Sequence, residues 1–339
     1  MGSPPDETPI GRWPARAVEQ KNSRGIALVS VLWILALLAI IAGSFTSNAR
    51  TNAKLAYNLA ENAKARALAD AGVNRAILAL LGPGRQPMLG PEMEALIVSR
   101  PELEQHWPAD GTIYGWRFGG GVALVSIQGE TGKIDLNTAR DELLKGLFLS
   151  VGLEDQEAAA LVDAIADFRD PDDLRRLNGA EDDDYRAAGF AYGAKDRAFG
   201  AVEELAQVMG MTRALYERVA PALTVYSGQS GIDPRTAPRE VLLALPGVDG
   251  NAVEALLATR AEATQAALLE LPGAADYLLQ SRRQVFTVRA EAKTAGGGIF
   301  VRQAVVQLSG DHKQSVVFHT WKQGTRQAPD EQESTTTLK

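Results

Sequence analysis

Twenty uncharged residues stand near the start of the chain, in the stretch IALVSVLWILALLAIIAGSF at residues 26–45. As an α-helix this stretch would be ~30 Å long, which matches the hydrocarbon core of a bilayer. Basic residues precede it at Arg12, Arg16, Lys21 and Arg24, and the positive-inside tendency favours keeping residues 1–25 in the cytoplasm. The pattern predicts one membrane-spanning helix with the remainder of the chain on the other side.

The helix is expected to continue beyond the apolar stretch. Leu55, Leu59, Ala63 and Ala67 recur at the spacing of one helix face, and polar residues fill the positions between them. Gly and Pro at residues 82–84 then end the pattern. We therefore predict one helix over residues 26–81, with its first half in a membrane or a filament and its second half against a globular head.

The junction before the apolar stretch separates three interpretations. A secretory signal peptide has a shorter apolar core and a small-residue cleavage site after it, and residues 43–45 make a poor site. A plain membrane anchor fits the hydropathy alone. The third interpretation rests on Arg24-Gly25 followed by Ile26, which resembles the leader of type IV prepilins. That resemblance predicts cleavage between Gly25 and Ile26, on the cytoplasmic side. Prepilins usually carry Glu at the fifth mature position, where this chain has Ser30.

Composition excludes several kinds of site. The chain has 339 residues, no cysteine and three histidines, none of which stands at metal-ligand spacing from another. Disulfides and zinc–thiolate sites are thus excluded, and a zinc hydrolase is disfavoured. The net charge of −7 disfavours nucleic acid as a general partner.

The head is predicted to be an antiparallel sheet interrupted by helices. Strand patterns occupy residues 112–118 and 122–127, and they return only at 285–292, 300–308 and 315–321. The expected organisation is a first part of the sheet within 82–134, a helical domain over 135–280, the remaining strands within 281–321, and a disordered tail over 322–339. The fold class is therefore α+β, with a large helical domain inserted between strands.

A weak internal repeat lies in the helical block. GKIDLNTARDELL at 132–144 is echoed by GIDPRTAPREVL at 231–242, and LPGVDG at 245–250 leads into another helix over 251–260. Thr138 and Thr236 are predicted N-caps, because a hydroxyl can bond the free N–H groups of a first helical turn. The second copy reads as a helix-hairpin-helix unit.

Such hairpins often bind DNA through backbone N–H groups, so a membrane-anchored DNA-uptake receptor is an alternative function. This hairpin fits that role poorly, because Asp249 stands where phosphate would approach. The surroundings are also acidic, whereas phosphate binding depends on Lys and Arg. A structural repeat without nucleic acid is the preferred interpretation.

The densest group of carboxylates in the chain lies at residues 167–184. It contains Asp167, Asp170, Asp172, Asp173, Glu181, Asp182, Asp183 and Asp184. Carboxylates without His or Cys favour a hard cation, with calcium first. The order is not that of an EF-hand, because Arg175 stands where Gly is required. A solvated acidic loop paired with Arg169, Arg175 and Arg176 remains an alternative. A glycosidase or a calcium-dependent hydrolase is a weaker one, because no nucleophile and base are positioned together.

Five segments in this order resemble one family, the GspK family of large minor pseudopilins of bacterial type II secretion. They are the leader at 24–33, GKIDLN at 132–137, DFRDPD at 167–172 with GAE and a Tyr at 179–185, VEELAQVMGM at 202–211, and TAPREVL at 236–242. The resemblance covers about residues 20–322. Phe168 stands where the family often has Trp, and Asp233-Pro234-Arg235 replaces its usual Asn-x-Asn.

The resemblance implies a fold and a function. The fold is a pseudopilin head with a helical domain inserted in its sheet. The function is that of a non-enzymatic subunit that starts and caps a short filament with I-type and J-type minor pseudopilins, after cleavage by prepilin peptidase and in company with other pseudopilins. It implies a single-pass inner-membrane protein with a periplasmic head. It also implies calcium bound by Asp170, Asp172 and Glu181 first, with the other predicted ligands at Asp167, Asp182, Asp183 and Asp184.

Overall fold

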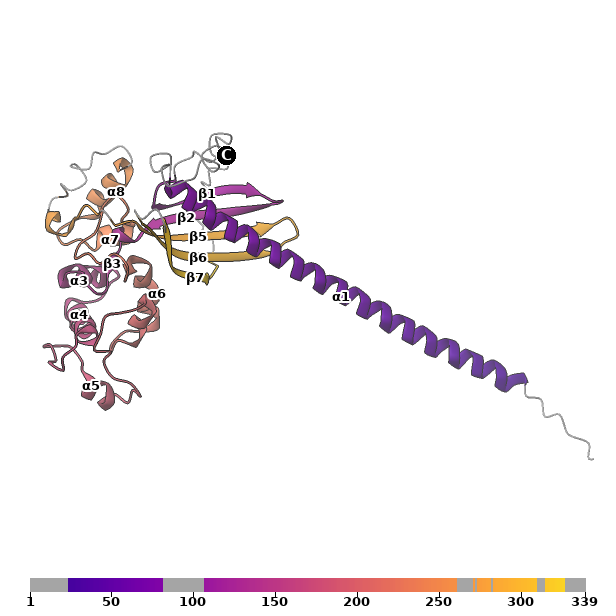
Figure 1. The fold of residues 1–339 in the computed structure, drawn as a ribbon. Helices are drawn as coiled ribbons and strands as arrows, with labels where there is room; N and C mark the ends of the chain where they lie inside the picture. Colours follow the sequence, from indigo (N-terminus) through magenta and orange to yellow (C-terminus); the bar gives the residue numbers. More distant parts are fainter. Residues whose placement is uncertain are drawn as a thin grey trace, which may run out of the picture. The chain divides into compact units, whose positions relative to one another are not determined.

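The computed structural model describes residues 24–81, 107–260, 271, 273–281, 283–309 and 315–326. It divides into two compact units, Met1–Ala60 and Glu61–Lys339. Most of the predicted leader, the connection at 82–106 and the tail from residue 327 lie outside the described residues. Elements are labelled as in Figure 1.

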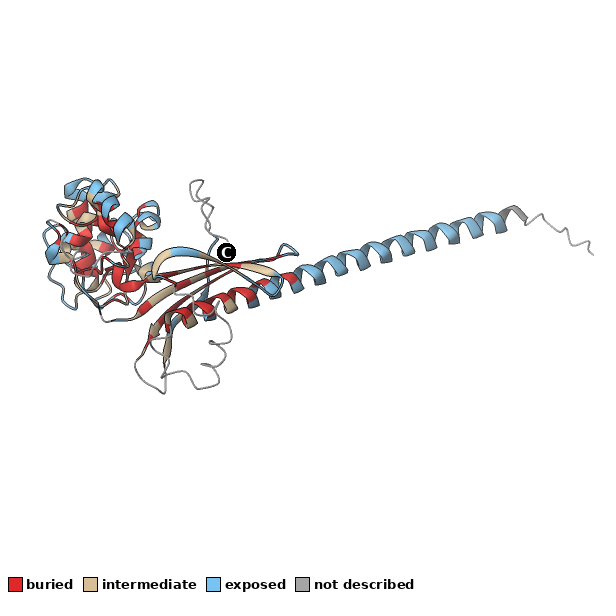
Figure 2. Ribbon diagram, turned by 90° about the horizontal axis from the view of Figure 1, so that it is seen from above, coloured by how far each residue is buried: buried red, intermediate tan, exposed pale blue. Residues whose placement is uncertain are grey.

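Helix α1 (Arg24–Leu81) begins two residues before the predicted start and ends where Gly and Pro were expected to stop it. Its described side chains from Ala27 to Ala60 are exposed throughout, the pale-blue part of the helix in Figure 2. Trp33 and Phe45 are 75% and 73% exposed. The helix is long and apolar enough to cross a membrane, with a mean hydropathy of 2.6 in its most apolar window. Large apolar side chains at this exposure indicate a segment that is covered in its working environment.

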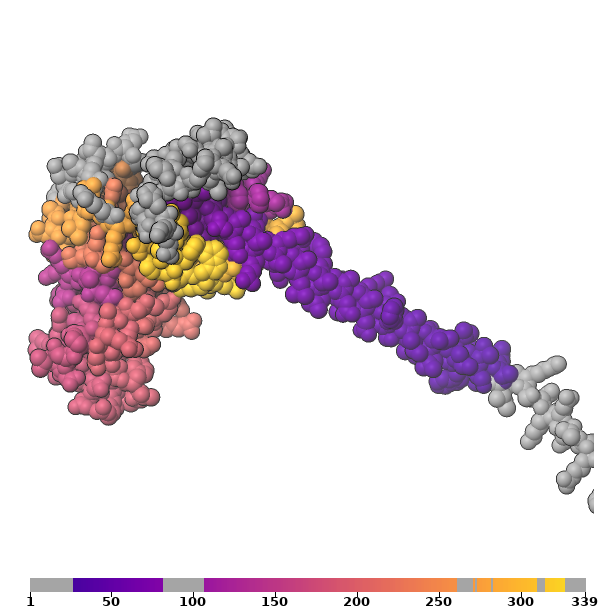
Figure 3. All heavy atoms as spheres, viewed as in Figure 1, coloured from indigo at the N-terminus to yellow at the C-terminus, as the bar shows by residue number. Residues whose placement is uncertain are grey.

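The head contains a five-stranded antiparallel sheet in the order β1-β2-β5-β6-β7. The strands are β1 (Asp110–Phe118), β2 (Gly121–Gly129), β5 (Val285–Thr294), β6 (Ile299–Leu308) and β7 (Val316–Gln323). Each contains or overlaps one predicted strand, and β7 runs two residues past the expected end at 321. In the space-filling view, the yellow atoms of the C-terminal strands lie at the surface of the head (Figure 3).

Small residues bring the last turns of α1 close to this sheet. Ala65, Ala69 and Val73 are fully buried on that helix face. A Cβ placed at Gly72 would lie 3.1 Å from the Cβ of Ala290 on β5, so the glycine sets the helix-to-sheet distance. Along the strands, every second side chain points toward α1. These side chains, Val125 among them, form the other side of the hydrophobic core between the helix and the sheet.

The helices lie in sequence between β2 and β5, as predicted. They are α3 (Asp141–Ser150), α4 (Asp155–Arg169), α5 (Asp182–Ala187), α6 (Arg213–Val219), α7 (Arg239–Leu243) and α8 (Gly250–Thr259). A two-stranded parallel sheet, β3 (Ile134–Asp135) with β4 (Leu223–Thr224), joins the start of this region to its middle. The strand patterns did not predict it, because two residues are too short to show alternation.

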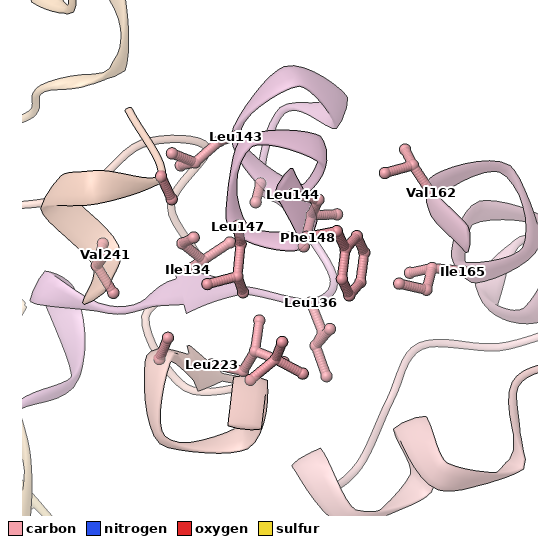
Figure 4. Packing of buried hydrophobic residues seen from close by; sticks show 14 of the residues in the cluster. Ile134, Leu136, Leu143, Leu144, Leu147, Phe148, Val162, Ile165, Leu223 and Val241 are labelled. Carbon is pink, nitrogen blue, oxygen red and sulfur yellow. The ribbon is translucent and has the colours of Figure 1, made fainter. Parts of the chain in front are cut away.

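The helical region has its own core, shown in Figure 4. Leu143, Leu144, Leu147 and Phe148 lie on one face of α3 at the three- and four-residue spacing of a helix, and all are at most 1% exposed. Ile165 of α4 is fully buried in the same cluster. The region therefore packs as a domain with an interior separate from the one under the sheet.

The internal repeat is present in the structure as a shared turn. Asp135 accepts a hydrogen bond from the N–H of Asn137 at 2.9 Å, and Asp233 accepts one from Arg235 at 3.0 Å. The N-cap prediction for the threonines was wrong, because α3 begins after Arg140 and α7 after Pro238. In each copy the Asp side chain accepts a backbone N–H of the turn, and the helix starts three residues after the Thr.

Buried Glu130 ties the helical region to the sheet. It is 2% exposed. Its carboxylate accepts bonds from Thr287 on β5 at 2.7 Å and from Thr224 on β4 at 2.5 Å, and it pairs with Lys133 at 2.7 Å. A buried charge with this many partners is satisfied in place and would be costly to leave half-paired.

Candidate functional site

The carboxylate of Asp167 is completely buried near the end of α4. It accepts the N–H of Arg176 at 3.1 Å. A Cβ at Gly179 would overlap this carboxylate, so the loop after α4 can fold against it only with glycine there. Burial is the main cause that raises the pKa of Asp167, with the charge of Asp170 adding to it.

Asp170 is the C-cap residue that directly follows α4, and its own N–H bonds the carbonyl of Ala166 at 3.0 Å. Its Oδ1 is buried and has no hydrogen-bond partner. Burial raises the pKa of this carboxyl, and the neighbouring charge of Asp172 raises it further. The position at a helix C-terminus also places a negative charge where the helix dipole disfavours one.

Glu181 is the most perturbed carboxylate of the group. It stands just before α5 and forms a capping box with Asp184, in which its side chain faces the N–H of Asp184. It is 7% exposed, and neither of its side-chain oxygens meets the geometry of a normal hydrogen bond. Burial, followed by the charges of Asp167 and Asp170, raises its pKa to about 7. A buried carboxylate without a donor is unusual in a folded protein, because each lost hydrogen bond costs free energy. The arrangement fits a positively charged occupant.

Two further carboxylates belong to this neighbourhood. Asp196 and Asp173 also raise the pKa of Glu181 by their charge. Asp173 was within the acidic segment but was not among the predicted ligands, and Asp196 lies well beyond it. Asp196 has φ of 54°, and among the described residues it is the non-glycine with positive φ. The density of acidic residues along the sequence could not predict Asp196, because this residue comes near Glu181 through a separate loop.

The remaining predicted ligands have other interactions in the structure. Asp172 is exposed and accepts the N–H of Leu174 at 2.9 Å. Asp183 pairs with Arg186, and Asp184 pairs with Arg175 at 2.9 Å. Asp182 is exposed. The pair of Asp184 with Arg175 agrees with the alternative of a solvated loop paired with arginines, whereas Asp183 pairs with Arg186, which that alternative did not name.

The residues present fit a hard cation by chemistry more than by preformed geometry. In the part of the chain that the structure describes, no three His, Asp or Glu side chains converge as a ready metal site. The orphaned oxygens of Glu181 and Asp170 are nevertheless the donors that calcium prefers. Calcium coordination tolerates flexible loops, and Asp172, Asp173 and Asp196 are the further carboxylates whose charges act on Asp170 or Glu181. Calcium and its ligands remain a prediction.

Comparison with known proteins finds similarity to one family. A family model described as type II secretion system protein K matches residues 123–228. The chain is 28% identical to a type II secretion system protein K of Klebsiella pneumoniae, over 66% of this chain and 70% of that one. It is 25% identical to the corresponding protein of Pseudomonas aeruginosa, over 71% and 73%.

A solved structure supports the same fold. The crystal structure of the GspK-GspI-GspJ complex from enterotoxigenic Escherichia coli contains a chain that matches 82% of this chain and all of its own, with a TM-score of 0.51 and 16% identity. The predicted resemblance to protein K and the α+β pseudopilin fold are thereby confirmed. The matches support a minor pseudopilin of type II secretion.

The predicted helix-hairpin-helix unit presents a carboxylate at the position expected for phosphate. Asp249 precedes α8 and accepts the N–H of Ala252 at 2.7 Å. The free N–H groups at that helix start are what an anion would bind. Because the Asp249 carboxylate accepts one of these N–H groups and carries the same sign of charge as phosphate, the geometry gives no support to the DNA-uptake alternative.

The predicted processing site falls at the start of α1. Gly25 and Ile26 are its second and third residues. Cleavage there remains a prediction, as does the absence of catalytic activity.

Proposed function

We propose that this chain is the tip subunit of a type II secretion pseudopilus, which starts the filament and caps it for export of folded proteins across the outer membrane. The observation that carries the proposal is the combination of a protein K domain with a long exposed apolar helix. The solved relative was determined in a complex with GspI and GspJ, which supports I-type and J-type minor pseudopilins as partners.

The physical argument for a tip position concerns Ser30 in the apolar helix and the helical region inserted in the head. Ser30 offers no carboxylate at the fifth position after Gly25, where the other subunits of such filaments pair with a neighbouring N-terminal amine. A subunit without that charge suits a site with no neighbour above it. The inserted helical region adds bulk to the head, which suits a subunit that stops further addition.

The membrane arrangement follows from the same helix. Prepilin peptidase would cut between Gly25 and Ile26 and leave α1 as the first element of the mature protein, anchored in the inner membrane with a periplasmic head. N-terminal sequencing of membrane-extracted protein should return a start at Ile26. A Gly25→Leu variant should keep Met1, and its matched control Gly43→Leu, with open space around its Cα, should be processed normally. An intact N-terminus in the unaltered protein would refute processing.

Filament length tests the cap directly. If the subunit terminates growth, producing it in excess over the major pseudopilin should yield more and shorter filaments, and its loss should yield few filaments. Electron microscopy of sheared filaments measures both. Unchanged number and length would exclude a cap while leaving membership in the family intact.

We also propose a structural calcium ion held by Asp167, Asp170 and Glu181, completed by Asp172, Asp173 or Asp196. The support is the buried, unpartnered state of the Glu181 carboxylate. A ligand bound only to the native state stabilises it by about 2.7 kcal/mol at a hundredfold excess over Kd.

Melting of the full chain in mild detergent, with calcium or with EDTA, tests this ion. We expect a higher Tm with calcium, a smaller effect of magnesium, and loss of the calcium effect in Glu181→Gln but not in Glu142→Gln, an exposed carboxylate on α3. If the Tm were the same with calcium and with EDTA, the proposed calcium ion would be wrong.

A further inference from the structure

A mostly apolar cavity of about 530 Å³ lies between α4 and α6. Leu161 and Ala164 of α4 line it on one side, and Leu215 of α6 lines it on the other. The backbone at 178–180, in the loop between α4 and α5, forms part of its wall. The volume is within the range of pockets that hold an apolar group, so the cavity can accept a large side chain.

Leu177 stands immediately before that wall. It is 90% exposed, more than any other large apolar side chain among the described residues, those of the apolar half of α1 included. It lies in a tight turn in which the N–H of Gly179 bonds the carbonyl of Arg176 at 3.2 Å. Its Cα is one residue, about 3.8 Å, from that of Asn178 in the cavity wall. The exposed Leu177 is therefore bonded directly to a residue that lines an apolar cavity.

Two carboxylates of α4 hold this turn in place. Asp167 accepts the N–H of Arg176 at 3.1 Å. Asp163 accepts both the backbone N–H and the side-chain amide of Asn178, each at 3.1 Å. The residue between these two anchors is Leu177, so its direction is fixed by hydrogen bonds to α4 and not by apolar packing.

We propose that the Arg176–Gly179 turn is a flap that closes by placing Leu177 in the cavity between α4 and α6. Asp163 holds the Asn178 end of the flap open, while Asp167 anchors the Arg176 end. Leu177 is the occupant favoured by the geometry because it needs only a local turn rearrangement, whereas a side chain from another molecule must also lose its translational freedom. Closure removes the leucine from water and fills the apolar space, and breaking the bonds from Asn178 to Asp163 opposes it.

The natural absence of cysteine allows the flap to be followed with introduced thiols. The probe pair is Leu177→Cys with Ala214→Cys, since Ala214 lines the cavity on α6. The matched control pair is Leu174→Cys with Ala214→Cys, because Leu174 is in the same loop and 78% exposed. The full chain in detergent is oxidised mildly in EDTA, so that the outcome does not depend on calcium, and linked peptides are identified by mass spectrometry.

We expect the probe pair to form an intramolecular disulfide at least several-fold faster than the control pair, because a disulfide requires Cα atoms within about 7 Å. Equal rates would overturn the flap. A disulfide found only between two molecules would also overturn it, because the leucine would then dock on a second copy.

A second measurement keeps Leu177 in place and follows one thiol at Ala214→Cys. Adding Asp163→Ala should slow its alkylation severalfold, because the released flap covers it. Leu177→Ser should restore the rate in that background, and Leu174→Ser should not. If Asp163→Ala left the alkylation rate unchanged in protein with an unaltered circular dichroism spectrum, the holding role of Asp163 would be wrong.

Discussion

Replacing Glu181 by Gln should change how the stability of the calcium-free protein depends on pH. The folded protein holds a proton on Glu181 up to a pKa of about 7, whereas the ordinary value is 4.5. Between these two pH values, the folded state binds more protons than the unfolded state, so the free energy of unfolding falls as pH rises. The stability that protonated Glu181 contributes to the folded protein is therefore lost as the pH rises through about 7.

The size of this effect follows from the same pKa values. Each pKa unit corresponds to about 1.4 kcal/mol, so the rise from 4.5 to about 7 gives a loss of roughly 3 kcal/mol. Asp167 and Asp170 have pKa values raised in the same direction, and their share remains in the variant. The difference between wild type and Glu181→Gln therefore reports Glu181 together with its coupling to these two neighbours.

The assay is urea unfolding of the detergent-solubilised full chain in EDTA, followed by near-ultraviolet circular dichroism from pH 4.5 to 8. We expect Glu181→Gln to be more stable than wild type at pH 8 by roughly 3 kcal/mol, with the difference shrinking toward pH 4.5. Glu142→Gln, at an exposed position on α3, should run parallel to wild type. If wild type and Glu181→Gln also ran parallel, the carboxylate would not be ionising in a buried acidic setting, and the argument for a cation there would fail.

Other residues give predictions for the same unfolding assay. Glu130→Ala should cost about 3 kcal/mol, because it leaves Lys133 and two threonine hydroxyls without their buried partner; a cost below the error of the assay would contradict this. Gly146→Ala should destabilise by about 2 kcal/mol or more, since a Cβ there would overlap the carbonyl oxygen of Ala244 and push α3 from α7. Gly250→Ala serves as its control, because open space surrounds that position in α8; it should be neutral or stabilise by up to about 1 kcal/mol, and equal losses at both glycines would refute the packing argument.

The sequence predicted the elements that have strong local signals. The apolar stretch and its continuation gave α1 because a uniform run of residues sets helix type and length without reference to the rest of the chain. The strands followed from alternation and glycine-rich separators, and the insertion followed from the gap between two groups of strands. The sequence did not predict the parallel pair β3–β4, since each strand is two residues long. It also misplaced the caps at Thr138 and Thr236, because Asp135 and Asp233 take the turn bonds first.

By itself, the sequence determined that the chain has a membrane-type helix, an α+β head of the protein K kind and a concentration of carboxylates after α4. Only the tertiary structure decided which carboxylates matter. It buried Asp167 and Glu181, left Asp183 paired with Arg186 at the surface, and brought the charge of Asp196 to bear on Glu181 from a separate loop. The physical reason is that charge density along a chain is local, whereas desolvation and the approach of a second loop depend on how distant segments pack.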